Sequence, residues 1–369
     1  MPGATIADVL PSALAVLGVP GPVDRLGLPE VRRIAVLLVD GLGHRLLPAA
    51  AEVGPVLADI TAGRLGTLTE LSSCFPSTTP TSLVSWGTGA WPGAHGIVGF
   101  TVNVPGTRRV LTHIIWRGDP DPAQWQPVPT QFEVAAAAGL ETTMVARPEF
   151  AGSGLTIAAY RGARFVGAAD ADALADRMLA ELGGPTPLVC GYHPNLDMAS
   201  HGYGIDSPQW REEAVEVDRL IERLVDGLPA DSALLVTADH GAVDVPADGR
   251  FDFDGDRRLR AGVRVVAGEA RVRYLHTRPG ARDDVIATWR DILGPAADVI
   301  TRDEAVAAGW FGPVAEAHLA RIGDVIVVCR DHHVVLASKH EPEKSSRLVA
   351  YHGSTTPDEM AIPLIVCTG

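Results

Sequence analysis

The run Ile34-Ala-Val-Leu-Leu-Val39, followed at once by Asp40-Gly-Leu-Gly43, decides the fold class of this 369-residue chain. The run does not alternate between apolar and polar residues, which indicates a strand covered on both faces, as in a parallel sheet. Open parallel sheets build their sites beyond the carboxyl ends of their strands, which is where Asp40 stands. An Asp at this position can equally cap the following helix, so Asp40 alone does not indicate a function.

Further apolar runs and helical patterns predict an α/β fold. Residues Ala171–Leu182 and Gln209–Leu228 have helical periodicity, and Ser207 and Pro208 are the expected N-cap and first residue of the second helix. Strands that alternate with helices predict a mostly parallel sheet with helices on both faces. The other expected buried parallel strands are Leu188–Gly191, Ala233–Thr237, Asp324–Cys329 and Ile362–Cys367.

The chain length suits one large α/β domain, residues 1–369, that carries insertions. Residues 102–128 are rich in Pro, Gly, Arg and Trp, which favours an excursion from the sheet. Residues 245–335 start with a stretch rich in Asp, Gly and Arg and then become more alternating, which favours an inserted, smaller α+β cap. Long excursions in compact domains often shape substrate pockets, and we expect that role for both.

Composition narrows the classes of function. The chain has 45 acidic and 31 basic residues and a formal net charge of −14, which argues against binding to long nucleic acid. The four cysteines form no CxxC pair, so reduced thiols are expected rather than a disulfide framework. The N-terminus lacks a basic signal-peptide region, and no long apolar window suits a membrane span, so we expect a cytoplasmic protein.

The segment Cys74-Phe-Pro-Ser-Thr-Thr-Pro-Thr-Ser-Leu-Val-Ser-Trp-Gly-Thr-Gly89 indicates a hydroxyl group at the start of a helix. Pro80 fits the first turn of a helix, which makes Thr79 the expected N-cap. The positive field at a helix N-terminus favours the alkoxide form of a hydroxyl placed there. It also favours a phosphoryl group nearby. Taken alone, an ordinary capping Thr explains the segment as well.

Aspartate and histidine residues recur next to the ends of predicted strands. Asp197 and His201 are four residues apart, Asp239-His240-Gly241 follows an apolar run directly, and His352-Gly353 precedes the last strand. Together with Asp40 they give three Asp and three His, a donor set that suits zinc and can hold two divalent ions. Manganese or a mixed pair fits the same donors.

Five motifs follow one another along nearly the whole chain. They are Asp40-Gly41; Pro76-x-x-Thr79 with Thr88-Gly89-x-x-Pro92-x-x-His95-Gly96-Ile97; Asp197-x-x-x-His201-Gly202; Asp239-His240-Gly241; and His352-Gly353. In this order they resemble the alkaline phosphatase superfamily, especially its nucleotide pyrophosphatase/phosphodiesterase branch. The resemblance implies an alkaline phosphatase-like fold.

The resemblance also implies roles for individual residues. One metal ion would be held by Asp197, His201 and His352, and the other by Asp40, Asp239 and His240. Thr79 would contact the second ion as the nucleophile, because it stands three residues after Pro76 and nine before Thr88, as the family pattern requires. The neighbouring Thr78 is the reserve candidate for the nucleophile.

Two positions depart from the family pattern. Phosphodiesterases of this group usually have an Asn three residues after the nucleophile, where this chain has Ser82, a smaller donor with shorter reach. The residue after the nucleophile often offers a backbone N–H to the phosphoryl group, but Pro80 has none. These differences affect the expected substrate preference and rate rather than metal binding.

The resemblance thus implies a metal-dependent hydrolase of phosphate esters with a covalent phospho-threonine intermediate. The leading substrates are phosphodiesters or nucleotide pyrophosphates, and small ligands such as nucleotides are the expected partners. Phosphate monoesters and phosphonates are the close alternatives, with a phosphomutase or an inactive binding protein behind them. Monoesterases usually bind the doubly charged phosphoryl group with an extra Arg or Lys, for which the candidates are Arg147, Arg161, Arg164 and Lys339.

Overall fold

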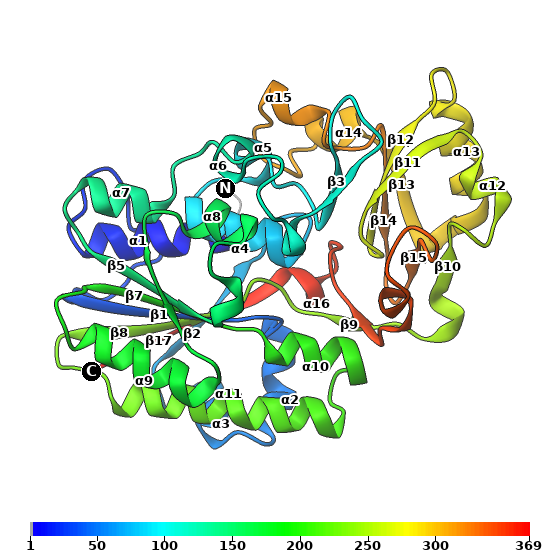
Figure 1. The fold of residues 1–369 in the computed structure, drawn as a ribbon. Coiled ribbons are helices and arrows are strands. Elements are labelled where there is room, and N and C mark those ends of the chain that lie inside the picture. Colours follow the sequence, from blue (N-terminus) through cyan, green and yellow to red (C-terminus); the bar gives the residue numbers. More distant parts are fainter. Residues whose placement is uncertain (1–2) are drawn as a thin grey trace.

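A seven-stranded sheet with helices on both faces forms the centre of the computed structural model, which describes residues 3–369 (Figure 1). Strands β1, β5, β6, β7 and β8 run parallel, so the predicted mainly parallel α/β sheet is confirmed. In spatial order the strands are β2 (Thr67–Ser72), β17 (Ala361–Thr368), β8 (Ser232–Thr237), β1 (Arg33–Val39), β7 (Leu188–His193), β5 (Thr142–Ala146) and β6 (Arg164–Gly167).

The direction of the last strand differs from the prediction. We expected residues 362–367 to run parallel to the rest, but β17 pairs antiparallel with both β8 and β2. An apolar run shows that both faces of a strand are covered, and it does not encode the strand's direction. The chain comes back to the sheet beside Gly241, whose N–H donates to the carbonyl oxygen of Glu359, just beyond the carboxyl end of β8. From that edge β17 has to run back along β8.

The predicted strand at residues 324–329 also belongs elsewhere. As β14 (Val325–Cys329) it lies in a separate four-stranded antiparallel sheet, so the prediction of a parallel strand was wrong. Val325 and Val327 face a small core around helix α13 (Arg282–Leu293), whereas Ile326 packs into the main core. Burial on both faces explains why the sequence does not alternate. The sheet comprises β11 (Val263–Gly268), β12 (Val272–Thr277), β14 and β13 (Ala297–Thr301).

The four-stranded sheet and its helices form a lobe beside the main sheet (yellow and orange in Figure 1). Strand β9 (Val243–Asp244) leads into this lobe and β16 (Ala350–Tyr351) leads out of it, and the two pair antiparallel. Strands β10 (Arg250–Asp252) and β15 (Val334–Leu336) form another two-stranded pair. The helices of this part are α12 (Arg257–Arg260), α13, α14 (Arg302–Ala307) and α15 (Glu316–Leu319). The earlier excursion, residues 102–128, contributes the hairpin of β3 (Thr101–Asn103) and β4 (Val110–Thr112) and helix α6 (Pro122–Trp125).

Two helical layers cover the main sheet (Figure 1). One face carries α1 (Val9–Val16), α4 (Thr79–Thr88), α7 (Gln131–Ala137) and α8 (Gly154–Tyr160). The other carries α2 (Leu47–Ala51), α3 (Pro55–Thr61), α9 (Ala171–Leu182) and α11 (Pro208–Asp226). The predicted start of α11 is confirmed, because the hydroxyl of Ser207 accepts from the N–H of Trp210. No helix within residues 3–369 is both long enough and apolar enough to cross a membrane.

Helix α4 begins one residue earlier than predicted. Thr78 is the N-cap, with an extended backbone at φ −129° and ψ 144°, and Thr79 is the first helical residue. The prediction that Thr79 caps the helix was therefore wrong by one position. Pro80 fits either register, because none of the N–H groups of a first helical turn has a partner within the helix.

A buried ion pair joins the lobe to the segment before β17. Arg271 and Glu359 are both buried, and the arginine Nε and Nη2 donate to the two carboxylate oxygens at 2.9 and 2.6 Å. The same oxygens accept from the N–H of Ser354 and the hydroxyl of Thr356. All of these bonds end on a single carboxylate, so the position of the segment after His352 depends on it.

Replacing Glu359 by Ala is therefore expected to lower the free energy of unfolding by about 3–5 kcal/mol, because the Arg271 guanidinium is then buried without a counter-charge. Urea denaturation measures the change. Glu316→Ala, at an exposed position of α15, is the control and should change stability by no more than about 0.5 kcal/mol. A change that small for Glu359→Ala would mean that the pair does not hold the segment in place.

Candidate metal centre

The six predicted ligands meet at the carboxyl edge of the three neighbouring strands β1, β7 and β8. Asp40 directly follows β1, and Asp239 and His240 follow β8. Asp197 and His201 lie on helix α10 (Asn195–Tyr203), which begins just after β7. His352 comes from the segment between β16 and helix α16 (Pro357–Met360). Because these strands are adjacent and parallel, residues more than 300 positions apart in the sequence become neighbours.

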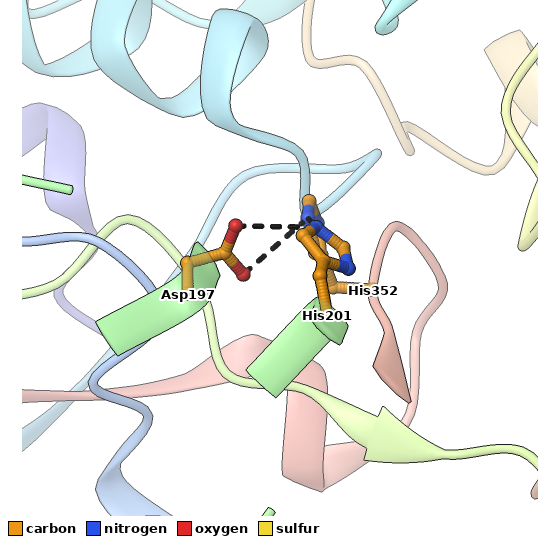
Figure 2. Close-up of side chains that lie close together, drawn as sticks. All are labelled: Asp197, His201 and His352. Carbon is orange, nitrogen blue, oxygen red and sulfur yellow. Dashed lines mark hydrogen bonds and ion pairs between the residues drawn. The ribbon is translucent and has the colours of Figure 1, made fainter. Parts of the chain in front are cut away.

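Asp197, His201 and His352 form the first group of potential ligands (Figure 2). The Nε2 atom of His201 lies 3.1 Å from Asp197 Oδ2, and that of His352 lies 3.8 Å from Asp197 Oδ1. The other ring nitrogen of each histidine bonds a backbone carbonyl oxygen, at Ala350 for His201 and at Ser77 for His352. Such backbone bonds fix the ring so that Nε2 points to the centre, as is usual for metal-binding histidines.

The second group lies directly beside the first. The ligand atoms of Asp40, Asp197 and His240 fall within 4.8 Å of one another. Asp239 is next to them, since its Oδ2 and Asp40 Oδ1 each lie 3.4 Å from His240 Nε2. Asp197 thus belongs to both groups. The structure brings all six predicted ligands together.

The donor set fits divalent cations. Three carboxylate oxygens in the centre are buried without a hydrogen-bond partner: Asp40 Oδ1, Asp197 Oδ1 and Asp239 Oδ2. Buried anionic oxygens without partners are costly, whereas paired carboxylates and imidazoles that converge on one point are ordinary ligands of zinc. The unpartnered oxygens therefore fit two bound ions.

The electrostatics of the protein without metal support the same reading. Burial raises the pKa of Asp40 well above its usual range, and the charges of Asp239 and Asp197 raise it further. Burial also raises the pKa of Asp239. Burial lowers the pKa of His201, but the contact with Asp197 outweighs this effect and brings it to about 9. Crowded carboxylates that hold protons, beside an imidazole that holds one, would exchange these protons for cations.

The structure distinguishes the two candidate nucleophiles. Thr79 Oγ1 lies 3.1 Å from His240 Nε2, and the residue is partly exposed. Thr78 is fully buried, and its hydroxyl has no hydrogen-bond partner. A nucleophile must contact both the bound metal and the substrate, and of these two residues it is Thr79 that is partly exposed and contacts a predicted ligand.

Ser82 does not replace the family's Asn as a group that faces the substrate. It is fully buried, and its hydroxyl lies 3.0 Å from that of Ser73. The Ser73 hydroxyl donates in turn to the backbone oxygen of Asp239 at 2.5 Å. The two serines therefore support the loop that carries Asp239 and His240.

One residue that contacts the centre was missed by the sequence analysis. The hydroxyl of Tyr192 donates to Asp40 Oδ2, which leaves Oδ1 to face the other ligands. Tyr192 lies opposite Leu38 in the pairing of β7 with β1, close to the carboxyl ends of both strands. The sequence shows only a Tyr at the end of an apolar run. Its contact with Asp40 depends on the strand order, which the sequence does not specify.

All four cationic candidates for phosphate binding have other partners or positions. Arg161 contacts Glu133, and Arg164 contacts Glu181. Lys339 is exposed in the segment after β15. Arg147 bonds Asn195, and its Nη1 lies 3.9 Å from the sulfur of Met198, the neighbour of Asp197. Within residues 3–369 no Arg or Lys side chain pairs with Thr79 or with any of the six predicted ligands.

Comparison with known proteins points in the same direction. Residues 34–355 match the family model described as type I phosphodiesterase / nucleotide pyrophosphatase. No individually curated protein matches the sequence.

Solved structures show the same fold. Murine ectonucleotide pyrophosphatase/phosphodiesterase 5 is 18% identical with a TM-score of 0.71, and the match covers 91% of this chain and 88% of that one. An inactive variant of that mouse protein, solved with AMP, gives a TM-score of 0.70 at 17% identity, with 90% and 87% coverage. Phosphonoacetate hydrolase from Sinorhizobium meliloti 1021, in complex with phosphonoformate, gives 0.70 at 21% identity, with 92% and 91% coverage.

Proposed function

Since the chain belongs to the type I phosphodiesterase / nucleotide pyrophosphatase family, and is thus a phosphoric ester hydrolase, we propose that it cleaves phosphodiesters through a covalent phospho-threonine on Thr79. The observation that carries this proposal is the position of Thr79. The residue is partly exposed and is the first residue of α4, and its hydroxyl lies 3.1 Å from His240 Nε2 beside a cluster of potential metal ligands. We propose nucleotides and other small phosphodiesters as the substrates.

Two divalent ions, zinc for this donor set, would neutralise the phosphoryl group and lower the pKa of the Thr79 hydroxyl when bound. Asp197, His201 and His352 would hold one ion. Asp40, Asp239 and His240 would hold the other. Because the oxygens of Asp197 lie close to both groups, this carboxylate would contribute to both positions.

The chain's own residues then supply the remaining chemistry. Thr79 Oγ1 forms a bond to phosphorus while the ester bond to the leaving alcohol breaks, and water later cleaves the phospho-threonine to release a phosphomonoester. The cap Thr78 makes no side-chain bond to the N–H groups of the first turn of α4, although Pro80 in this turn has no N–H. Such N–H groups favour an anionic phosphoryl oxygen.

Charge favours diesters over monoesters. A diester carries one negative charge on its phosphoryl group, whereas a monoester carries close to two near neutral pH. The absence of a paired Arg or Lys at the predicted ligands, within the described residues, leaves the second charge without a side-chain cation.

We expect the zinc-loaded protein to have a higher kcat/KM for bis(4-nitrophenyl) phosphate than for 4-nitrophenyl phosphate, by roughly tenfold or more. This factor corresponds to the one charge-assisted contact that the monoester lacks. Release of nitrophenol measures both reactions under the same conditions. Phosphate release from phosphonoacetate tests the alternative phosphonate substrate in parallel. A higher value for the monoester or the phosphonate would replace the diester proposal with that activity.

A further inference from the structure

A glutamate from the lobe reaches the edge of the metal centre. Glu269 lies in the tight turn between β11 and β12, which two backbone bonds between Glu269 and Val272 close at 2.8 and 3.1 Å. The turn presses its side chain against Gly353, the neighbour of His352. A Cβ atom at Gly353, which has φ +129°, would lie only 2.7 Å from Glu269 Cδ. The glycine therefore leaves room for the glutamate beside a predicted metal ligand.

The carboxylate of Glu269 has an oxygen with nothing to bind. Its Oε1 is buried and has no hydrogen-bond partner of regular geometry, although the adjacent Thr78 hydroxyl lies close enough to lower the pKa of Glu269. Glu269 is partly exposed as a residue. A buried, unpartnered carboxylate oxygen costs free energy that a donor from outside the chain would recover.

The charges around Glu269 do not balance. The two nearby arginines each have their own carboxylate, since Arg271 pairs with Glu359 and Arg273 pairs with Glu341. Glu269 is the third carboxylate in this cluster of two cations. Burial raises its pKa to about 8, and the lowering effects of the Thr78 hydroxyl and of the Arg273 charge do not offset it.

Glu269 is also separate from the potential metal ligands. Each group of ligand atoms within 4.8 Å of one another includes Asp197, and neither includes Glu269. Glu269 lies beside Gly353, the neighbour of His352, and beside Thr78, the neighbour of Thr79.

We propose that Glu269 recognises the organic group of the substrate and selects phosphodiesters in which that group carries an ammonium, as in 2-aminoethyl esters. This inference rests on the proposed function, because it places the phosphoryl group at Thr79. The ammonium supplies both the hydrogen-bond donor and the positive charge that Glu269 lacks within the chain. Esters with a carboxylate at the same place supply neither that donor nor that charge and would bind less well.

Binding of two isosteric phosphate monoesters, 2-aminoethyl phosphate and propyl phosphate, tests the proposal without depending on turnover. Both are titrated calorimetrically into the zinc-loaded Thr79→Ala protein, which cannot consume them by the proposed route. We expect 2-aminoethyl phosphate to bind roughly tenfold more tightly, the ratio typical of one charge-assisted contact. In Thr79→Ala/Glu269→Gln, which keeps the shape and removes the charge, the ratio should fall to about one.

Thr79→Ala/Glu316→Gln is the matched control, because it removes an equal charge at an exposed position of α15 and should keep the tenfold ratio. A ratio near one in the Thr79→Ala protein, or a ratio that Glu269→Gln leaves unchanged, would overturn the proposal. If Glu269→Gln does not fold, Glu269→Asp provides the second variant, and a ratio identical to that of the parent protein would count against the proposal. Hydrolysis of bis(4-nitrophenyl) phosphate by the unaltered protein tests the proposed function separately. If that hydrolysis occurs while the binding ratio is near one, only the role of Glu269 is wrong.

Discussion

Thr79→Ala is expected to lower kcat for bis(4-nitrophenyl) phosphate by on the order of 10⁴-fold or more, the scale of losses when a covalent nucleophile is removed. Without Oγ1 no phospho-threonine can form, whereas the Asp and His donors stay in place. The zinc content per chain should therefore equal that of the unaltered protein. Steady-state kinetics and metal analysis after gel filtration measure the two quantities on the same sample.

Two further variants sharpen this test. Thr79→Ser keeps a hydroxyl at the same backbone position and should recover much of the lost rate. A phosphorylated peptide that contains Thr79, trapped by acid quenching during turnover, would identify the intermediate directly. The assignment fails if Thr79→Ala turns over normally, or if Thr78→Ala rather than Thr79→Ala abolishes the reaction.

Asp197→Asn is expected to have the second large effect, because Asp197 contributes oxygens to both groups of potential ligands. The substitution keeps the size of the side chain but removes one charge, so the affinity for both ions should fall. We expect less than one zinc ion per chain after dialysis and a loss in kcat/KM on the order of 10³-fold, since two-metal chemistry contributes several kcal/mol to the transition state. Atomic emission analysis of the dialysed protein gives the metal content.

His352→Ala provides the comparison within the centre. His352 belongs to one group only, so this variant should lose one ion in preference to the other. Asp226→Asn removes an equal charge from an exposed position at the end of α11 and should retain both ions. Two zinc ions bound to Asp197→Asn with unchanged affinity would show that the two groups do not share this carboxylate.

Much of the site could be predicted because its chemistry depends on short local patterns. Asp239-His240 follows a strand directly, and Asp197 and His201 occupy one turn of a helix, so each pair is visible without knowledge of the fold. The resemblance to a known family then linked them with Asp40 and His352. The structure brings these six residues together, as the sequence indicated.

The features that were missed all depend on the arrangement of elements in space. The direction of β17 follows from where the lobe returns the chain to the sheet, and its apolar residues would suit either direction. Tyr192 meets Asp40 only because β7 lies beside β1. Glu269 reaches the centre through a turn in a sheet whose strand order no local pattern encodes. Local patterns and the family resemblance indicated the predicted ligands, whereas tertiary structure determines their neighbours.

The pairing of β9 with β16 gives the lobe a particular evolutionary freedom. Its entry and exit are tied together by this ribbon, one residue before His352, so the chain between them leaves and rejoins the scaffold at nearly one point. Exposed segments beyond the ribbon can be lengthened, shortened or exchanged while the distance between its ends stays fixed. The predicted metal ligands all lie outside the lobe, whereas Glu269 lies within it. Related enzymes could thus acquire new substrate ranges through changes in the lobe, while the residues of the metal centre stay the same.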